Sequence, residues 1–476
     1  MNPAANTRYD AIIIGSGIGG GGVGALLAHA GWKVLLLERN KLIGGRCISY
    51  DRSGCVMDLG WHFYCLGKVG PLQEICNRIG MPDSIPWNDL NGTSYIQIGK
   101  VAKKYSKQSM YEAASEDERD NFKRLFQTVF TITDAELDQL WYVPVADWVQ
   151  SFTKDKMANT LIESFVSQYF CVPSSVASAT EFIRAFRDVM ANRATSYPSG
   201  GNYSVPVAYI EAIKKFGGVV KTDTPVAKVI VENGAAVGVL TEAGEEYRAP
   251  VIIGNADLKM TVLDLVGEVH FPQAYIEKVK NLTYSCHGVM LRVLCSEKVT
   301  SKQVVIYIPD DQSPPCKVTE EMQAGKVPHL IGGCFGSPTE FDPKLAPEGK
   351  QMITSLHACP PDIREHIDEW RESLMRSFYE VYPEARGKVE KIWVDPPSLI
   401  KGLCGETGAI IGIGQTIDQV HEKRPSVVSP LKGLYFASSE AGGHGIGTEL
   451  AATSALELFG KLVPAARAAK PQPVPA

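Results

Sequence analysis

Several signatures that define other classes of protein are missing from this chain of 476 residues. Its eleven cysteines are odd in number and include no Cys-x-x-Cys pair, which argues against a disulfide framework and against a zinc site. The net charge of −5 leaves no basic excess for binding nucleic acid. No internal repeat is present. We therefore expect reduced thiols, a cytoplasmic location, no metal and no nucleic-acid partner.

A membrane span also has little support. The segment 11–31 carries no charged residue apart from a histidine, but most residues from 15 to 25 are Gly or Ser, which suit a lipid-facing helix poorly. Arg8 and the run Ala28-His29-Ala30 imitate a signal peptide, yet cleavage there would remove the glycine-rich turn on which the rest of the chain depends. With 45% hydrophobic residues, we expect a globular protein of two or three domains.

What is present is a dinucleotide-binding fingerprint near the start of the chain. An apolar strand at 11–14 is followed by a glycine turn, a helix of small residues, and a second strand that ends in Glu38. Gly15 permits the tight turn, Gly17 lets a pyrophosphate approach the backbone, and Gly20 lets the helix pack close to the strand. The helix N-terminus attracts phosphate. Glu38 lies where a ribose-binding acid belongs.

Gly44-Gly45-Arg46 follow directly, and an NAD-binding unit has no need for them. A glycine pair lets the backbone pass close under a cofactor, while a guanidinium can meet phosphate or flavin. With these residues the chain resembles the FAD-dependent oxidoreductases that include amine oxidases, phytoene desaturases and carotenoid isomerases. The block Asp58-Leu59-Gly60-Trp61-His62 is similar to that family's turn beside the flavin. The resemblance therefore implies FAD as the cofactor.

Two further segments carry the resemblance. The order Pro-x-Gly-Gly, helix, Gly-Gly, hairpin, strand and Asn-Ala-Asp over 198–257 is similar to the phytoene desaturase branch, and so is the glycine-rich run 442–447 before a last helix. The resemblance implies that this helix points its positive end at the flavin's pyrimidine ring and stabilises negative charge there. It also implies the cofactor-binding residues Gly15, Gly17, Gly20, Glu38, Arg39, Gly44, Gly45, Arg46, Val226, Glu440, Gly445 and Ile446.

The fold class that we expect is α/β, with a discontinuous Rossmann-like FAD-binding domain and a second, substrate domain of antiparallel sheet plus helices. Residues 1–67, 196–283 and 401–463 are assigned to the FAD-binding domain, 68–195 to a helical part and 284–400 to a β-rich part of the substrate domain. The Ala- and Pro-rich tail, 464–476, is expected to be flexible.

Local patterns add detail to the helical part. Residues 115–118 and 133–136 predict helix capping boxes. Apolar residues at helical spacing over 122–130 predict a core-facing stripe, with a channel lining or a membrane-facing surface as the alternative.

Three reactions fit a FAD enzyme of this kind: desaturation of a C–C bond, oxidation of an amine, and isomerisation of a polyene. Amine oxidases of the resembled family frame the flavin with an aromatic pair, and His444 is the only ring within 442–447. We therefore favour desaturation of an apolar or alicyclic substrate by hydride transfer to flavin N5. Oxygen or a quinone would reoxidise the flavin, peripheral membrane contact is an alternative location, and the oligomeric state stays open.

Removal of a proton from the substrate would require a catalytic base. The resemblance places His62 and His444 near the flavin, so both are candidates for the group that accepts the proton. An unactivated hydrocarbon substrate would need no conventional base, and both histidines would then only bind. Rab-escort and GDP-dissociation-inhibitor proteins resemble the same glycine unit and bind prenylated proteins without catalysis, which leaves a non-catalytic prenyl-protein-binding homologue as a remote alternative.

Overall fold

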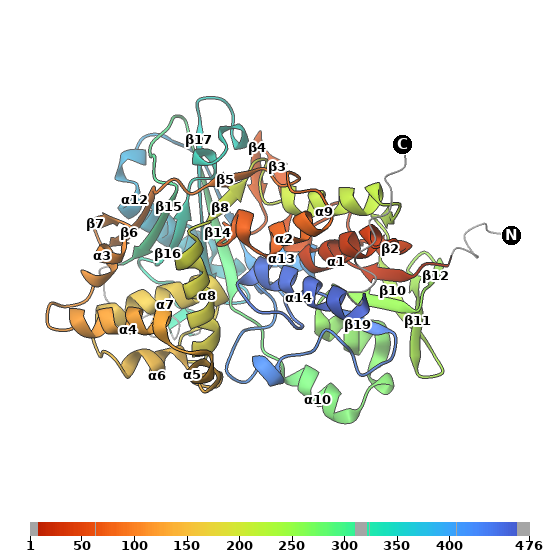
Figure 1. The fold of residues 1–476 in the computed structure, drawn as a ribbon. Coiled ribbons are helices and arrows are strands. Elements are labelled where there is room, and N and C mark those ends of the chain that lie inside the picture. Colours follow the sequence, from red (N-terminus) through yellow and green to blue (C-terminus); the bar gives the residue numbers. More distant parts are fainter. Residues whose placement is uncertain (1–7, 62, 310–320, 323, 406, 464–476) are drawn as a thin grey trace.

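The computed structural model describes residues 8–61, 63–309, 321–322, 324–405 and 407–463. Its architecture is α/β, as predicted, with two main sheets that draw on segments far apart in the chain. In Figure 1 the parallel sheet and its helices lie to the right, while the larger mixed sheet and the helices α3 to α8 lie to the left. The tail that was predicted to be flexible, 464–476, lies outside the described residues.

A five-stranded parallel sheet has the order β19-β13-β1-β2-β9. The three central strands are buried at every position, because other elements cover both faces of the sheet. The pairing of β13 with both β1 and β19 joins the start, the middle and the end of the chain. The strands are β1 (Ala11–Ile14), β2 (Val34–Leu37), β9 (Val219–Lys221), β13 (Val251–Gly254) and β19 (Leu434–Phe436).

The close packing of helix α1 (Ile18–His29) explains why its first turns contain additional glycines. It is buried on almost every side, between the sheet and three other helices. A Cβ at Gly22 would lie 2.8 Å from Ile75 of α2, and a Cβ at Gly24 would lie 2.8 Å from side chains of β1 and α9. These glycines therefore admit the neighbouring helices as well as the sheet. The three helices are α2 (Pro71–Arg78), α9 (Ser204–Lys215) and α14 (Gly447–Leu462).

The other face of the parallel sheet packs on the antiparallel meander that the sequence predicted. Val229 and Val239 of the meander share one core with Ile12 and Leu35 of the parallel sheet. The meander is made of β10 (Val226–Glu232), β11 (Ala235–Thr241) and β12 (Glu246–Arg248), and the π-helical segment η4 (Met260–Gly267) and α10 (Gln273–Asn281) follow β13 along the chain.

The second sheet has seven strands in the order β18-β14-β17-β16-β15-β6-β7. Five antiparallel strands come from the predicted β-rich part, and α12 (Ile367–Val381) shares their core. These strands are β14 (His287–Cys295), β15 (Val304–Ile308), β16 (Gly333–Gly336), β17 (Gln351–Cys359) and β18 (Val389–Asp395).

Two strands of this sheet come from the segment that was predicted to be mostly helical. Strand β6 (Ser94–Ile98) pairs in parallel with β15, and β7 (Val101–Lys104) pairs with β6. The buried side chain of Gln97 donates hydrogen bonds to the carbonyl oxygens of Gly99 and Glu380, at 2.9 and 2.8 Å. The partner that stabilises β6 lies about two hundred residues further along the chain.

Two helices between residues 105 and 195 begin near the predicted capping boxes. The box at 133–136 is confirmed, because Thr133 and Glu136 exchange side-chain to backbone hydrogen bonds. The box at 115–118 is wrong, because Ser115 donates to Asp155 at 2.7 Å and α4 begins only at Arg119. The apolar stripe of α4 is core as far as Val129, as predicted, whereas Phe130 at its end is 41% exposed. The helices are α3 (Lys107–Tyr111), α4 (Arg119–Thr131), α5 (Asp134–Asp138), α6 (Val145–Gln150), α7 (Lys156–Phe170) and α8 (Ala179–Asn192).

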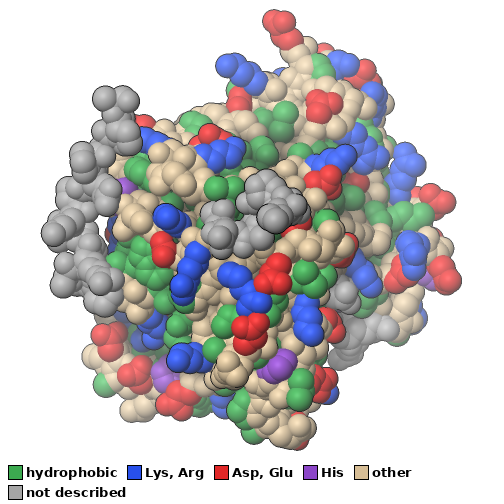
Figure 2. Space-filling view, turned by 90° about the vertical axis from the view of Figure 1, so that its right-hand side faces the viewer, with side chains coloured by type: hydrophobic (Ala, Val, Ile, Leu, Met, Phe, Trp, Pro, Cys, Tyr) green, Lys and Arg blue, Asp and Glu red, His purple; other side chains and the backbone are tan. Residues whose placement is uncertain are grey.

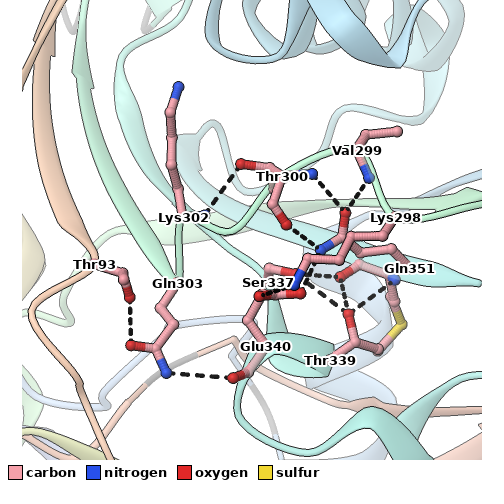
Figure 3. Close-up of polar contacts among 11 residues, drawn as sticks. Thr93, Lys298, Val299, Thr300, Lys302, Gln303, Ser337, Thr339, Glu340 and Gln351 are labelled. Carbon is pink, nitrogen blue, oxygen red and sulfur yellow. Dashed lines mark hydrogen bonds and ion pairs between the residues drawn. The ribbon is translucent and has the colours of Figure 1, made fainter.

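A polar network secures the connection from β14 to β15, as Figure 3 shows. The buried amide of Gln351 donates to the carbonyl oxygen of Thr300 and to Glu340, and its oxygen accepts from the N–H groups of Val299 and Thr300. Every hydrogen-bonding atom of this buried amide thus has a partner. Other short strands and helices are β3 (Ser49–Arg52), β4 (Cys55–Asp58), β5 (Trp87–Asp89), β8 (Ser196–Pro198) and α13 (Pro397–Cys404), besides several single-turn 3-10 helices.

On the face drawn in Figure 2, Lys and Arg side chains are interspersed with Asp and Glu side chains. Among the described residues, we find no helix that is both long enough and apolar enough to cross a membrane.

Candidate cofactor and substrate site

One large cavity, with a volume of about 2100 Å³, is lined by residues from both sheets. Its lining begins at the turn between β1 and α1 and extends to α7 and to the strands β15, β16 and β17. Pockets for drug-sized ligands usually measure about 300 to 1,000 Å³. The cavity is therefore large enough for a dinucleotide together with a second large ligand.

The glycine turn at one end of the cavity leaves no room for side chains. Gly15 has a φ of +100°, and a Cβ at Gly20 would lie 2.4 Å from the carbonyl oxygen of Gly15. The strictest position is Gly19, where a Cβ would lie 2.1 Å from the carbonyl oxygen of Ala437. The fingerprint predicts Gly15, Gly17 and Gly20 but not Gly19, because the neighbour of Gly19 lies after β19, near the other end of the chain.

The second glycine motif lies beside the first. Gly44 and Gly45 have φ values of +111° and +58°, and a Cβ at Gly45 would lie 3.4 Å from the Cα of Gly17. Arg46 lines the cavity, and its Nε donates to the carbonyl oxygen of Ala409 at 3.2 Å. The structure thus brings together the two motifs that the sequence analysis assigned to the cofactor.

Glu38 lines the cavity beside the glycine turn and stabilises that turn by hydrogen bonds. Its carboxylate accepts hydrogen bonds from the backbone N–H and the hydroxyl of Ser16, at 3.0 and 2.5 Å, and from the N–H of Asn40 at 2.8 Å. Arg39 and Val226 line the cavity together with Glu38. Glu38 and Arg39 directly follow β2, and Val226 begins β10, as expected for the adenosine end of a dinucleotide site.

Glu440 supplies an unsatisfied acceptor in the cavity wall. Its side chain is 2% exposed, and Oε2 accepts from the N–H of Leu258 at 2.7 Å. Oε1 has no hydrogen-bond partner among the described residues. Burial, and then the nearby Asp257, raise the pKa of Glu440 to about 7, while Arg46 opposes this shift. A buried, unpartnered carboxylate oxygen beside glycines without space for a Cβ fits a hydroxyl-rich dinucleotide cofactor.

The last helix, α14, presents its N-terminus to the cavity. Ile446, Gly447, Thr448 and Glu449 line the cavity, whereas Gly445 lies behind them. Free N–H groups and the helix dipole at this end favour a negatively charged partner. The guanidinium of the buried Arg424 stabilises the loop before α14. It donates hydrogen bonds of 2.6 Å to the carbonyl oxygens of residues 439 and 442.

The two histidines proposed as bases have different outcomes. His62 lies outside the described residues, although its neighbours Trp61 and Phe63 both line the cavity. His444 is exposed and lines a separate hollow of about 240 Å³, together with Glu181 and Asp188 of α8. It does not line the large cavity. This geometry gives no support to His444 as the base.

The far part of the cavity combines an apolar wall with polar and charged side chains, none of which was predicted from the sequence. The charged ones include Lys103, Glu112, Asp155, Lys156 and Glu163. His357 is 2% exposed, with Nδ1 at 2.9 Å from the carbonyl oxygen of Gly332 and Nε2 at 2.8 Å from the hydroxyl of Ser355. Burial lowers the pKa of His357 to about 4, so the ring is neutral at pH 7. Nothing in the local sequence marks His357 as a cavity residue. The apolar lining includes Trp61, Phe63, Ile96, Ile98, Met157, Val172, Ile306, Ile308, Ile331, Leu356 and Ile410.

A parallel sheet with two abutting glycine motifs and a glycine-led helix from the other end of the chain is the arrangement of a dinucleotide-binding protein. Residues 24–457 match the family model described as flavin containing amine oxidoreductase, and the chain belongs to that family. The predicted cofactor, FAD, and the predicted superfamily are therefore confirmed.

Among curated proteins, the chain is similar to enzymes named for retinol and for carotenoid precursors. It is 24% identical to the all-trans-retinol 13,14-reductase of Rattus norvegicus, and the alignment covers 91% of this chain and 82% of that protein. It is 25% identical over 316 residues to a 4,4'-diapophytoene desaturase of Methylomonas sp, covering 60% and 61%. For an inactive all-trans-retinol 13,14-reductase of Danio rerio, 26% identity extends over 54% of this chain and 49% of that protein. The chain thus spans about half to four fifths of these relatives.

Among solved structures, an oxidoreductase from Methanosarcina mazei has the same fold. Its TM-score is 0.76 at 20% identity, and the superposition covers 95% of this chain and 100% of that chain. This likeness concerns the fold alone.

Proposed function

We propose that the protein dehydrogenates a carbon–carbon bond of a long apolar or alicyclic substrate, with FAD as the hydride acceptor. The observation that carries the proposal is the continuity of the cofactor cradle with a large cavity of mainly apolar lining. Bound FAD supplies a ring that accepts a hydride.

We propose the same two domains that the sequence predicts. Residues 1–67, 196–283 and 401–463 would form the FAD-binding domain, and residues 68–195 and 284–400 would form the substrate domain. The two glycine motifs, Arg46 and the N-terminus of α14 would bind the cofactor. Glu38, Arg39 and Val226 would hold its adenosine end, and Glu440 would accept a hydrogen bond from it.

The apolar residues that line the cavity would bind the substrate and exclude water. Ile306 and Leu356, from two strands of the mixed sheet, face the same cavity as Val172, which follows α7. Such a surface binds a hydrocarbon by removing its area from water, at roughly 25 cal/mol per Å². It also excludes water from the place where the C–H bond is broken. Retinol and diapophytoene, which appear in the names of the relatives, are apolar polyenes, and this supports the same substrate class.

Reduction of a C=C bond is the second candidate. The reductase of Rattus norvegicus aligns with 91% of this chain, more than the desaturase does. The same cavity would serve both directions, because the direction depends on the reductant or oxidant that exchanges electrons with the flavin. We propose oxygen or a quinone as the oxidant for the dehydrogenation. Amine oxidation, polyene isomerisation and peripheral membrane contact stay alternatives.

An anaerobic panel tests the proposal. Oxidised holoenzyme is mixed with 4,4'-diapophytoene in detergent, with a cyclic ketone, or with a primary amine, and loss of the flavin absorbance is followed. We expect bleaching by the polyene precursor or the alicyclic compound and none by the amine. Ile306→Glu, which places a charge inside the cavity, should abolish bleaching. Val101→Glu, at a rim position that is 61% exposed, serves as the matched control. Bleaching by the amine alone would contradict the proposal.

A further inference from the structure

A buried carboxyl group, that of Glu449, lies in the cavity wall at the first turn of α14. Its side chain is 3% exposed. The carboxylate accepts hydrogen bonds from the N–H of Leu66 at 3.3 Å and from the hydroxyl of Thr448 at 3.0 Å. These contacts fix the acid between the loop after β4 and the last helix, where the cofactor end of the cavity meets its apolar part.

Thiols and phenols, but no counter-ion, surround Glu449 among the described residues. No Lys or Arg lies within ion-pair distance of its carboxylate in the described part of the chain. Burial raises the pKa of Glu449 above its ordinary value of 4.5, and hydrogen bonds from backbone N–H groups oppose the shift. The titratable groups that face it from the packed elements are Cys47, Tyr64, Cys65, Tyr169 and Tyr209.

Glu449 differs in this respect from Glu440, the other buried acid of the cavity. Arg46 and Arg424 both act on Glu440, and its free oxygen fits a cofactor hydroxyl. Glu449 instead shares its part of the cavity with Cys65 and Tyr169, next to the apolar residue Phe63. A buried carboxyl group whose pKa is raised, in the wall of a mainly apolar cavity, is suited to exchange a proton with a substrate carbon.

We propose that Glu449 is the proton-exchanging catalytic residue of this site, an inference that rests on the proposed function. In the dehydrogenation, one substrate carbon loses a hydride to FAD. The neighbouring carbon loses a proton to the Glu449 carboxylate, and the electron pair of that C–H bond becomes the second bond of the new C=C. The substrate thus loses two hydrogens, and the carboxyl group later releases its proton to solvent. In the reverse direction the same carboxyl donates the proton.

Glu449→Gln tests this role, because an amide keeps the size and the acceptor for Leu66 but cannot take the proton. With 4,4'-diapophytoene as the probe, we expect the rate of anaerobic bleaching to fall by about 10²-fold or more at unchanged flavin content. Glu449→Asp should recover part of the rate. The matched control is Glu181→Gln, which alters another buried glutamate with a raised pKa that lies outside the large cavity.

A second readout needs no flavin. In the infrared spectrum of the flavin-free protein, the protonated carboxyl signal that Glu449→Gln removes, taken as the difference from the wild type, should titrate above pH 4.5. Glu181→Gln and Glu440→Gln should each remove a different component and leave this one in place. Titration at or below 4.5 would overturn the inference. If Glu449→Gln loses FAD, the wild-type bleaching rate decides, since it should rise with pH through the same pKa, and a flat profile would overturn the inference.

The two proposals fail in different ways. If no polyene or alicyclic compound bleaches the wild-type enzyme, the proposed function fails. If the wild type is bleached and Glu449→Gln bleaches equally fast, only the role of Glu449 is overturned.

Discussion

At the residue scale, backbone atoms near the cofactor end of the cavity leave no space for a side chain at Gly19. A Cβ at Gly19 would meet the carbonyl oxygen of Ala437, which cannot rotate away as a side chain could. We expect Gly19→Ala to lose FAD and to lower the free energy of unfolding by at least about 2 kcal/mol, because the strain must be relieved by moving a strand or a helix. Flavin absorbance per protein and urea denaturation measure the two effects.

The control for this substitution is Gly460→Ala in α14, where a Cβ meets nothing within 4 Å. Replacing an unconstrained helical glycine by alanine should stabilise the protein by up to about 1 kcal/mol. Equal effects of the two substitutions would show that the contact with Ala437 is not the cause.

The buried carboxyl of Glu440 predicts a pH dependence of stability. Its pKa is raised from 4.5 to about 7, so between these values the folded protein binds more protons than the unfolded chain. The contribution of Glu440 to stability is therefore fully present below pH 4.5 and is lost as pH rises to about 7. We expect denaturation of the flavin-free protein to show this decline, and Glu440→Gln to flatten it. A variant with the same pH slope as the wild type would refute this assignment.

At the scale of elements, one buried ion pair links β14, β18 and the residues around the end of β4. Arg292 of β14 is 1% exposed, and its Nε donates to Asp395 of β18 at 2.6 Å. Its Nη2 donates to the carbonyl oxygens of Asp58 and Leu59, next to the cavity. Arg292→Met should cost about 3 kcal/mol, the lower end for a broken buried pair, because Asp395 keeps Arg52 at 3.1 Å and the hydroxyl of Tyr50 at 3.3 Å.

Chemical denaturation checks this value, and Lys280→Met is the control. Lys280 forms an exposed ion pair with Glu268, at 2.7 Å, and pairs of that kind contribute less than about 1 kcal/mol. Similar losses in both variants would contradict the role assigned to burial.

The elements that could be predicted from sequence are those defined by neighbours in the chain. The first strand–helix–strand unit, the meander at 226–248 and the capping box at Thr133 each follow from a local pattern. The capping box at Ser115 failed because Asp155, forty residues away, offers a better partner. Strand β6 was missed because its partner, β15, belongs to a distant segment.

The site was predictable to the same extent. Glycine turns and the acid at the end of β2 have fixed spacings, so Gly15, Gly17 and Glu38 were recognised. Gly19, His357 and Glu449 depend on which distant segments meet at the cavity, and no spacing in the sequence encodes that meeting.

At the scale of the whole molecule, the cavity exists only because both ends of the chain meet. Its lining extends from Ile14 to Ala451, and β19 joins the sheet that β1 began. FAD should therefore stabilise the entire fold. At a free concentration one hundred times its Kd, we expect about 2.7 kcal/mol of added unfolding free energy, with a Tm that rises with FAD concentration. A Tm that is independent of FAD would contradict a site built from both ends.

The central claim is that this protein removes hydrogen from a carbon–carbon bond, and a single anaerobic turnover tests it most directly. Oxidised enzyme in excess is mixed with 4,4'-diapophytoene, and the mass of the product and the amount of flavin reduced are measured together. We predict a product that has lost two hydrogens for each flavin reduced. A product of unchanged mass with no reduced flavin, or flavin reduction by an amine alone, would contradict the account.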